Sequence, residues 1–146
     1  MIQIIQATLS NLTELAILFD TYRQFYEQES DLTLAKNFLR QRIENNESII
    51  FMAYDDGKAL GFTQLYPSFS SVSAQRLWIL NDLFVIFESR GKGIGEALLL
   101  KAQSFVRKTN AKGLSLETHK INPAQKLYER LGWQNDQDYL HYFWRA

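Results

Sequence analysis

LNDLFVIFESRGKGIG, residues 80–95, is the stretch of sequence that decides the fold. It completes an apolar run over 75–87 that we expect to be a long strand, and a helix with inward-facing apolar residues is expected over 96–108. Between them, glycines permit positive φ angles and let a ligand approach the backbone closely. The N-terminus of a helix also offers unpaired N–H groups and the positive end of its dipole. This strand, turn and helix therefore predict a cradle for an anion such as a pyrophosphate.

Two well-known phosphate-binding turns are excluded by the residues that follow Gly95. A P-loop requires Lys-Ser or Lys-Thr after its last glycine, whereas Gly95 is followed by Glu96-Ala97. The dinucleotide-binding fingerprint requires its third glycine one position later, where the chain has Glu96. Taken alone, the turn is equally compatible with a tight strand-to-helix connection that binds nothing.

Working outward toward the N-terminus, the pattern predicts two helices followed by a hairpin. Apolar residues recur at helical spacing after Ser10, which we expect to cap the first helix, and Asp31 or Thr33 is expected to begin the second. Asp56-Gly57 is a strong hairpin signal. The other expected elements are strands over 2–7, 48–54 and 59–66 and a polar loop over 67–73.

Toward the C-terminus, strands are expected over 113–118 and 139–144. Between them, Asn122-Pro123 is expected to begin a helix, since asparagine is a good cap and proline suits the first helical position. Gly132 is expected to close that helix. The expected order is β-α-α-β-β-β-α-β-α-β, and no linker or repeat interrupts it, so we expect a single domain over residues 1–146.

Composition limits the functions that the chain can have. Of its 146 residues, 16 are basic and 16 acidic, so no global field attracts nucleic acid or an anionic membrane. The absence of cysteine excludes disulfides, thiolate catalysis and zinc–sulfur sites, and His119 and His141 lack metal-ligand spacing, so we expect no metal. No basic residue precedes Arg23 and the apolar runs are too short to span a bilayer, so we expect a cytoplasmic protein with no membrane partner.

The glycine turn matches the Gln/Arg-x-x-Gly-x-Gly/Ala motif of the GNAT superfamily of N-acetyltransferases at Arg90, Gly93 and Gly95. Residues 80–85 resemble the fourth strand of that superfamily, and residues 124–133 resemble its last helix and the turn that follows. The resemblance extends over nearly the whole chain and is closest to the small spermidine/spermine acetyltransferase-like and histone acetyltransferase-like members. It implies an α+β or α/β fold in which four helices flank a central, mostly antiparallel mixed sheet of six to seven strands.

The resemblance also implies that acetyl-CoA is the co-substrate. Its pyrophosphate would be bound by backbone N–H groups along the turn, at Arg90, Gly91, Lys92, Gly93, Ile94 and Gly95. The side chain of Lys92 either adds a charge contact or is simply solvated. The pantetheine arm would pair like an extra strand with the backbone of Leu83, Phe84 and Val85.

Tyr128 matches the general acid of the superfamily. A thiolate leaving group resembles cysteine, with a pKa of about 8.5, and tyrosine titrates near about 10, so Tyr128 can donate a proton at neutral pH. The alternative is an ordinary core aromatic. Asn122 resembles the asparagine that begins the last helix, but it lies six residues before Tyr128, one fewer than is usual in the superfamily. Its capping role is therefore expected, while a contact with coenzyme A is left open.

The general base has three candidates. The spermidine/spermine acetyltransferases carry a glutamate just before the aspartate of the fourth strand, and here that position is Asn81, which cannot act as a base. Asp82 remains, although alternation along the strand can point it away from the substrate. His119, after the strand over 113–118, and a water relay are the other two candidates.

The expected activity is transfer of the acetyl group of acetyl-CoA to a primary amine of a small molecule or peptide by direct attack on the thioester. Glu27, Glu29 and Asp31 form either a solvated acidic loop or a site that attracts a cationic amine. The alternative function is a non-catalytic sensor or interaction module that binds acyl-CoA on the same fold. Relatives often dimerise, and the aromatic C-terminal segment packs either internally or across a subunit interface, so we expect a homodimer.

Overall fold

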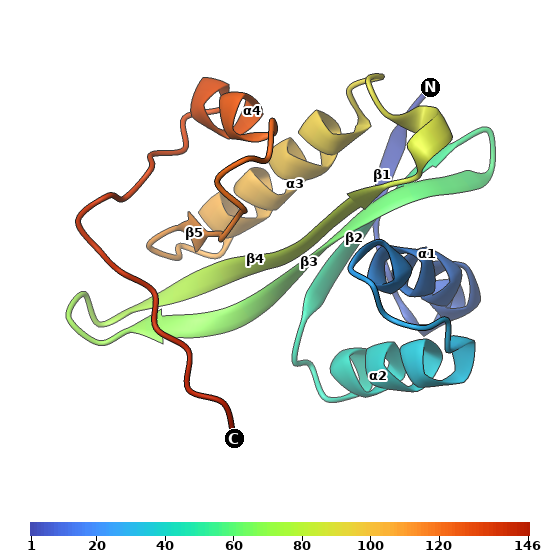
Figure 1. Cartoon of the computed structure of the whole chain (residues 1–146), viewed down its shortest axis with the longest axis horizontal. Helices are drawn as coiled ribbons and strands as arrows, with labels where there is room; N and C mark the ends of the chain where they lie inside the picture. The colour runs from blue at the N-terminus through green and yellow to red at the C-terminus, as the bar shows by residue number, and fades with distance from the viewer.

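The computed structural model describes residues 1–146 and contains one five-stranded sheet, shown in Figure 1. The strands lie in the order β1-β2-β3-β4-β5; the first four are antiparallel, and β5 is parallel to β4. The strands are β1 (Gln3–Gln6), β2 (Ile49–Asp55), β3 (Lys58–Ser70), β4 (Gln75–Val85) and β5 (Leu114–Ser115). The helices are α1 (Leu12–Phe25), α2 (Leu32–Glu44), α3 (Ile94–Lys108) and α4 (Gln125–Arg130), with short 3-10 turns η1 (Leu9–Asn11) and η2 (Phe87–Ser89).

Helices cover both faces of the sheet and enclose two separate cores. α1 and α2 pack on one face, where Leu15, Leu39 and Phe62 are fully buried. α3 packs on the other face, where Leu98 and Leu99 lie against the sheet. α4 lies beside α3 (Figure 1) and adds half-buried side chains to this core. None of these helices has both the length and the apolar character needed to cross a bilayer.

A β-bulge at Asn81 reverses which side chains of β4 face which core. Gln64 of β3 pairs with Asp82, whereas the next residue of β3, Leu65, pairs with Leu80, so Asn81 is an extra residue in β4. Before the bulge, Leu80 lies in the α3 core. After it, Phe84 lies in the core beneath α1 and α2. The bulge therefore turns Asp82 toward α1.

Gly61 lets β3 and β4 approach closely at the end of β4. A Cβ atom added to Gly61 would lie 2.5 Å from the carbonyl oxygen of Phe84 and 3.2 Å from the Cα of Val85. Neither of these backbone atoms can move without shifting β4. Only glycine therefore fits this contact.

The sheet has fewer strands than the six to seven that the sequence predicts, and the strand expected over 139–144 is absent. That segment carries five large apolar side chains that are at least 78% exposed: Tyr139, Leu140, Tyr142, Phe143 and Trp144. The strand expected over 113–118 is reduced to Leu114–Ser115. Because β5 offers a ladder of only two residues, a further strand beside it has little backbone to pair with.

The polar loop expected over 67–73 is also wrong, because β3 continues to Ser70 and only residues 71–74 turn. Pro67 pairs with Trp78, whose N–H donates to Gly113 on the opposite side of β4. Pro67 therefore lies at a position where no N–H is needed toward β4. β2 has already ended opposite Leu65, so no hydrogen bond is lost on that side either.

Several helix ends differ from the expected positions. Thr8, rather than Ser10, caps the first helical turn, where its Oγ1 accepts from Ser10 N and Asn11 Oδ1 accepts from Thr8 N. α3 begins at Ile94, so Gly95 belongs to the helix. α4 begins only at Gln125, although Asn122 Oδ1 still accepts a hydrogen bond from Ala124 N at 2.9 Å. The observed helix starts thus lie one to three residues away from the positions that the capping residues predict.

Candidate active site

The outer edge of β4 is free over its second half. β5 pairs only with Trp78 and Ile79, so it leaves β4 before the bulge. Ile86 N donates to Leu60 O on β3, and alternate residues of a strand face alternate edges. The backbone polar groups of Leu83 and Val85 therefore face the free edge, whereas those of Phe84 face β3. The open edge offers a ladder position to an extended ligand.

Arg90 occupies part of this free edge. Its Nε donates to Val85 O at 3.0 Å. Its guanidinium carbon lies 5.3 Å from the ring centroid of Phe25 and 5.8 Å from those of Phe84 and Phe87. These contacts are cation–π interactions that hold the side chain against the strand. The side chain of Arg90 is thus engaged by the protein, and its backbone remains part of the turn.

The glycine turn forms an empty cradle directly after this edge. Gly91 and Gly93 have φ angles of +76° and +80°, in the left-handed region, and α3 begins at the next residue, Ile94. A Cβ added to Gly91, Gly93 or Gly95 would meet nothing within 4 Å. The first N–H groups of α3 have no partner within the helix, because Ala97 N is the first to donate to a helical carbonyl, that of Gly93. The turn therefore presents unpaired N–H groups to open space.

Two charged side chains flank the cradle without entering it. Lys92 is exposed, and its charge acts on the carboxylate of Asp55 at the end of β2. Glu96, in the first turn of α3, forms a two-point ion pair with Arg130 of α4, with N–O distances of 3.1 and 2.9 Å. This pair ties the start of α3 to α4, and Arg130 offsets the negative charge nearest the cradle.

Tyr128 lies on α4 with its ring half-buried against the α3 core. The helix ends in a Schellman motif, in which Trp133 N donates to Tyr128 O and Gly132 N to Glu129 O, and Gly132 has a φ of +93° as expected for a closing glycine. Burial raises the pKa of the Tyr128 hydroxyl, the nearby Tyr26 hydroxyl raises it further, and a hydrogen bond with Thr118 lowers it. The hydroxyl of Tyr128 therefore stays protonated at neutral pH, and it lies near Tyr26, the residue that follows α1.

His119 and Asn122 share one turn between β5 and α4. Nδ1 of His119 accepts a hydrogen bond from Ile121 N at 3.3 Å, and His119 O accepts one from Asn122 N. Asn122 Nδ2 donates to Thr118 Oγ1 at 3.0 Å. His119 is exposed, and its one side-chain hydrogen bond stabilises the turn itself. Asn122 contacts the residue whose hydroxyl reaches Tyr128.

Asp82 lies on the opposite face of the sheet, where its side chain is 4% exposed. Gln64 Nε2 donates to Asp82 Oδ2 at 2.5 Å and Asn81 Nδ2 donates to Oδ1 at 3.0 Å. The Tyr22 hydroxyl acts on the same carboxylate. Burial raises the pKa of Asp82, although these three donors oppose the shift. Asp82 is therefore a stronger base than an exposed aspartate.

Three residues of this face were not singled out as site residues by the sequence, namely Tyr22, Gln64 and Asp20. Tyr22 is one of seven residues in the apolar stripe expected for the first helix, and Tyr26 of the same stripe also carries a hydroxyl, so the pattern does not distinguish Tyr22. Asp20 is buried in α1, where it accepts hydrogen bonds from Ser30 Oγ at 2.7 Å and from Asp31 N at 2.8 Å. Asp20 thereby anchors the connection between α1 and α2. The sequence signal for Asp20 is a charged residue next to the apolar stripe of a helix, at a position that the helix buries.

The acidic residues of that connection have unequal roles. Asp31 caps α2, because its Oδ1 accepts from Leu34 N at 3.0 Å. Glu27 and Glu29 are exposed, and Glu27 has a φ of +64° in the turn after α1. Only Glu27 and Glu29 are thus free to act on a ligand through their charge.

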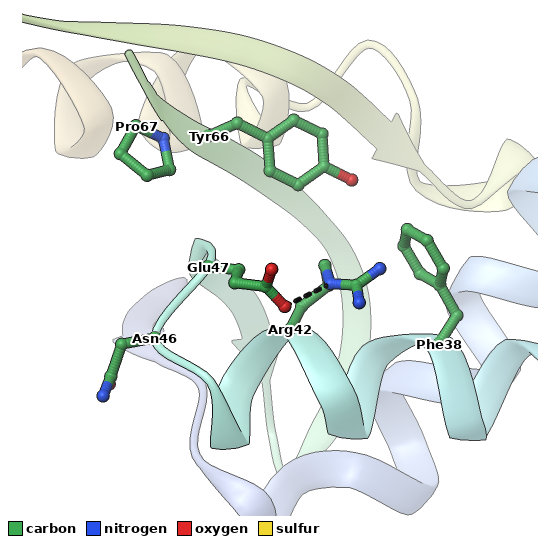
Figure 2. A pocket seen from close by; sticks show the side chains of 6 residues that line it. All are labelled: Phe38, Arg42, Asn46, Glu47, Tyr66 and Pro67. Carbon is green, nitrogen blue, oxygen red and sulfur yellow. Dashed lines mark hydrogen bonds and ion pairs between the residues drawn. The ribbon is translucent and has the colours of Figure 1, made fainter. Parts of the chain in front are cut away.

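A cavity of about 530 Å³ lies between α2 and β3 (Figure 2). Its lining residues are Phe38, Arg42, Asn46, Glu47, Tyr66 and Pro67. Arg42 Nε donates to Glu47 Oε1 at 3.2 Å, and the guanidinium lies 4.5 Å from the centroid of the Phe38 ring. Burial raises the pKa of Tyr66 to about 12, and the charge of Asp82 contributes to this shift. The cavity and the buried carboxylate are therefore neighbours, with Tyr66 between them.

The family model of the acetyltransferase (GNAT) family matches residues 13–133. The chain belongs to this family. It is 48% identical over 138 residues to the uncharacterized N-acetyltransferase YhfO of Bacillus subtilis (strain 168), a match that covers 94% of this chain and 93% of that protein. It is 36% identical over 132 residues to a probable acetyltransferase of Haemophilus influenzae (strain ATCC 51907 / DSM 11121 / KW20 / Rd), covering 82% of this chain and 90% of that one. The crystal structure of a probable acetyltransferase superposes with a TM-score of 0.93 at 41% identity, covering 99% of this chain and 97% of that one.

The GNAT match contains every residue discussed above as part of the site, from Tyr22 to Tyr128. It ends at Trp133, so the exposed C-terminal segment over 134–146 lies outside it. The GNAT fold that the sequence predicts is confirmed by this match and by the structural similarity, with five strands in place of six to seven.

Proposed function

We propose that this GNAT member transfers the acetyl group of acetyl-CoA to a primary amine of a small molecule or peptide. The observation that carries the proposal is the free edge of β4, which runs directly into an unfilled glycine cradle at the N-terminus of α3. An extended chain that ends in a pyrophosphate has the same two features, namely polar groups along an arm and a compact anion at its end. Unpaired N–H groups and the helix dipole favour that anion.

The turn and the free edge of β4 would bind different parts of the cofactor. The backbone from Arg90 to Gly95 would hold the pyrophosphate, and outward-facing groups of Leu83 and Val85 would pair with the pantetheine arm. Phe84 would not pair with the pantetheine arm itself, because its N–H and C=O groups face β3. It lies between Leu83 and Val85 and would keep their outward-facing groups in register. Asn122 would act on the same site through Thr118 and the turn before α4.

Tyr128 is the proposed general acid. Its hydroxyl is held on a helix that is closed by Gly132 and fixed to α3 by the pair of Glu96 and Arg130. Its raised pKa keeps the proton available at neutral pH for a departing thiolate. Acetyl transfer then releases coenzyme A as the thiol.

Asp82 is the proposed base, in preference to His119. A primary amine with a pKa of about 10.4 is almost entirely protonated at neutral pH, so acetylation requires a proton acceptor. Asp82 is a buried carboxylate whose pKa is raised, and it lies beneath α1, within reach of the site through Tyr22. His119 is exposed and occupied with the N–H of Ile121.

The test is release of coenzyme A from acetyl-CoA in the presence of a panel of primary amines, measured with a thiol reagent. We expect turnover with at least one amine and a loss of kcat of about 10²–10⁴-fold in Tyr128→Phe, with acetyl-CoA affinity held within a few-fold. Tyr54→Phe is the matched control, because Tyr54 is half-buried on β2, outside both the proposed site and the C-terminal segment. Tight acetyl-CoA binding without turnover for any amine would instead support the non-catalytic sensor.

We also propose that the protein is a cytoplasmic homodimer. The exposed aromatic residues over 139–144 support the dimer, because so much contiguous apolar surface is typical of an interface. Sedimentation of the intact chain and of a chain ending at residue 138 would test it. We expect a dimer for the first and a monomer for the second, and two monomers would overturn the proposal.

A further inference from the structure

We propose that the hydroxyl of Tyr22 takes the proton from the ammonium group of the acceptor and passes its own proton to Asp82. This inference rests on the proposed acetyl transfer and adds the residue that links a buried carboxylate to the substrate. In this arrangement Tyr22 touches the acceptor, Asp82 receives the proton, and Gln64 holds Asp82 in position.

Asp82 cannot itself reach an acceptor, because its neighbours enclose it. Its side chain is 4% exposed, and its two carboxylate oxygens already accept from Asn81 and Gln64. Its backbone is fixed as well, since Thr63 Oγ1 donates to Asp82 O at 2.8 Å. A proton that leaves a substrate must therefore reach Asp82 through another group.

Tyr22 lies between Asp82 and the open surface. Its ring packs on the side chains two residues away from Gln64 and Asp82, with centroids 5.6 Å from Phe62 of β3 and 5.9 Å from Phe84 of β4, and its hydroxyl acts on the Asp82 carboxylate. Its ring centroid also lies 5.1 Å from that of Tyr26. Tyr22 is half-buried, whereas Tyr26 is 59% exposed. The hydroxyl of Tyr26 in turn acts on both Tyr22 and Tyr128. Tyr22 and Tyr26 thus lead from the buried carboxylate to the surface.

The proton transfer balances without any other reactant. The N–H bond of the ammonium breaks, its proton bonds to the Tyr22 oxygen, and the Tyr22 proton bonds to a carboxylate oxygen of Asp82. Burial and the charge of Asp82 raise the pKa of Tyr22 far above its usual value, so a free tyrosinate does not form and the two protons move together. The products are a neutral amine, a neutral tyrosine and a protonated Asp82.

Gln64 can form a hydrogen bond with Asp82 in both of its protonation states. Its side chain is fully buried, its Nε2 donates to Asp82, and its Oε1 has no hydrogen-bond partner. A buried acceptor without a partner costs free energy. When Asp82 is protonated, rotation of the Gln64 amide brings Oε1 to the new O–H donor. The same side chain therefore stabilises both protonation states of Asp82.

The titratable groups that face Asp82 are tyrosines. Tyr22 comes from α1 and Tyr66 from β3, and the other side chains on the carboxylate are the amides of Gln64 and Asn81. Arg42 of α2 acts on Tyr66. Tyr22 and Tyr66 remain neutral in the ordinary pH range, so a fall in rate at acid pH that Asp82→Asn abolishes reports on Asp82.

The experiment compares Tyr22→Phe, Asp82→Asn and the double variant with the wild-type protein, using an amine that the wild type acetylates. We expect each single variant to lower kcat by about 10²–10³-fold, and the double variant to lose little more, because both changes break one proton path. Acetyl-CoA affinity and the melting temperature of Tyr22→Phe should change little. Tyr54→Phe is the matched control, since Tyr54 is half-buried on β2 and its hydroxyl donates to Met52 Sδ at 3.9 Å rather than to Asp82.

Two further measurements separate proton transfer from a structural role. The wild-type rate should fall at low pH as Asp82 becomes protonated, and Asp82→Asn should lack this fall. In mixtures of H₂O and D₂O, the wild-type rate should depend on the deuterium fraction along a curve, because two protons move, and Tyr22→Phe should lose that curvature. Near-normal kcat in Tyr22→Phe, or losses that multiply in the double variant, would overturn the inference while leaving acetyl transfer intact. Absence of turnover in the wild type would overturn both.

Discussion

Strand β4 presents one set of groups to α3 and another to α1, and the two sets come from very different lengths of chain. Toward α3 and the free edge, the groups from Leu83 to Gly95 are contiguous in sequence. Toward α1, Asp82 meets Tyr22 of α1 and Gln64 of β3, which are 60 and 18 residues away in sequence. The first set is formed by local chain geometry, whereas the second exists only when three elements pack together.

This difference follows from the groups that each face uses. The cradle uses backbone N–H groups and needs only glycine φ angles and a helix start. The Asp82 face uses side chains, which must be brought within hydrogen-bonding distance by the sheet register and by packing of α1. We therefore expect changes at the cradle to affect cofactor binding alone, and changes beneath α1 to affect the acceptor reaction or the fold.

The largest expected effect is at the cradle. Gly95→Val places a side chain in the open space above the turn at a helical position that does not need positive φ, so the fold should be retained. Loss of even two charge-assisted hydrogen bonds to the pyrophosphate corresponds to a rise in the Kd of acetyl-CoA of about 100-fold or more. Calorimetric titration measures it.

The control for that variant is Gly113→Val, because Gly113 also has no atom within 4 Å of an added Cβ and does not adopt positive φ. Its acetyl-CoA affinity should be unchanged. Equal affinities for both variants would place the cofactor away from the turn and would remove the contrast between the two faces.

The next effect is on the close approach that supports the end of β4. Gly61→Ala brings a Cβ to 2.5 Å from Phe84 O, so β3 and β4 must separate or tilt. We expect a loss of about 1–3 kcal/mol in the free energy of unfolding, and a melting temperature lower by about 2–4 °C for each kcal/mol. Thermal unfolding of Gly61→Ala and of the control Gly113→Ala tests this. Equal melting temperatures would show that β4 can shift away from the added Cβ without a loss of stability.

A smaller effect is expected at the connection between α1 and α2. The Ser30 hydroxyl, followed by the Asp31 N–H, lowers the pKa of Asp20 in the folded protein, although burial opposes it. A depressed folded pKa contributes stability above the unfolded value of about 3.9, and that stability is lost as pH falls through the folded pKa. Asp20→Asn should therefore lower stability by about 1–2 kcal/mol at pH 7 and by less at acid pH.

Denaturant unfolding at several pH values measures this difference. The control is Asp138→Asn, since Asp138 is exposed in the C-terminal segment. A difference between Asp20→Asn and wild type that stays constant with pH would assign the loss to packing rather than to the charge.

The smallest effect is expected from the free acidic residues. Replacement of Glu27 and Glu29 by glutamine should raise the KM of a cationic acceptor by a few-fold at low salt. Because exposed charges are screened over about 8 Å at physiological ionic strength, the effect should fade as salt is added. Asp31 is left unchanged because it caps α2. Identical steady-state kinetics at low salt would leave these residues as a solvated loop.

The sequence predicts most element types correctly where the signal is local. The glycine turn, the hairpin at Asp56-Gly57 and the closing glycine at Gly132 are found as expected, with positive φ at all four glycines Gly57, Gly91, Gly93 and Gly132. The loop predicted to begin at Pro67 is wrong, because proline ends a strand only where a neighbouring strand needs its missing N–H. The aromatic residues over 139–144 misled it too, since strand propensity does not supply a partner strand.

The proposed site shows the same division. Tyr128 and the turn from Arg90 to Gly95 are proposed from local motifs. Tyr22 is proposed only from the packing of α1 on the sheet, because in the sequence it is one more aromatic residue in the apolar stripe of a helix. The direction of Asp82 was open as well, since alternation predicts the face of a side chain only while the strand is regular.

The amino-acid sequence by itself determined the strand, turn and helix from β4 to α3, because glycine φ angles and helix starts are properties of a few adjacent residues. The tertiary structure alone decided the bulge at Asn81, the burial of Asp82 beside Tyr22 and Gln64, and the early departure of β5 from β4. Each of these depends on register and packing between segments far apart in the chain. Their free energy comes from contacts that no local pattern contains.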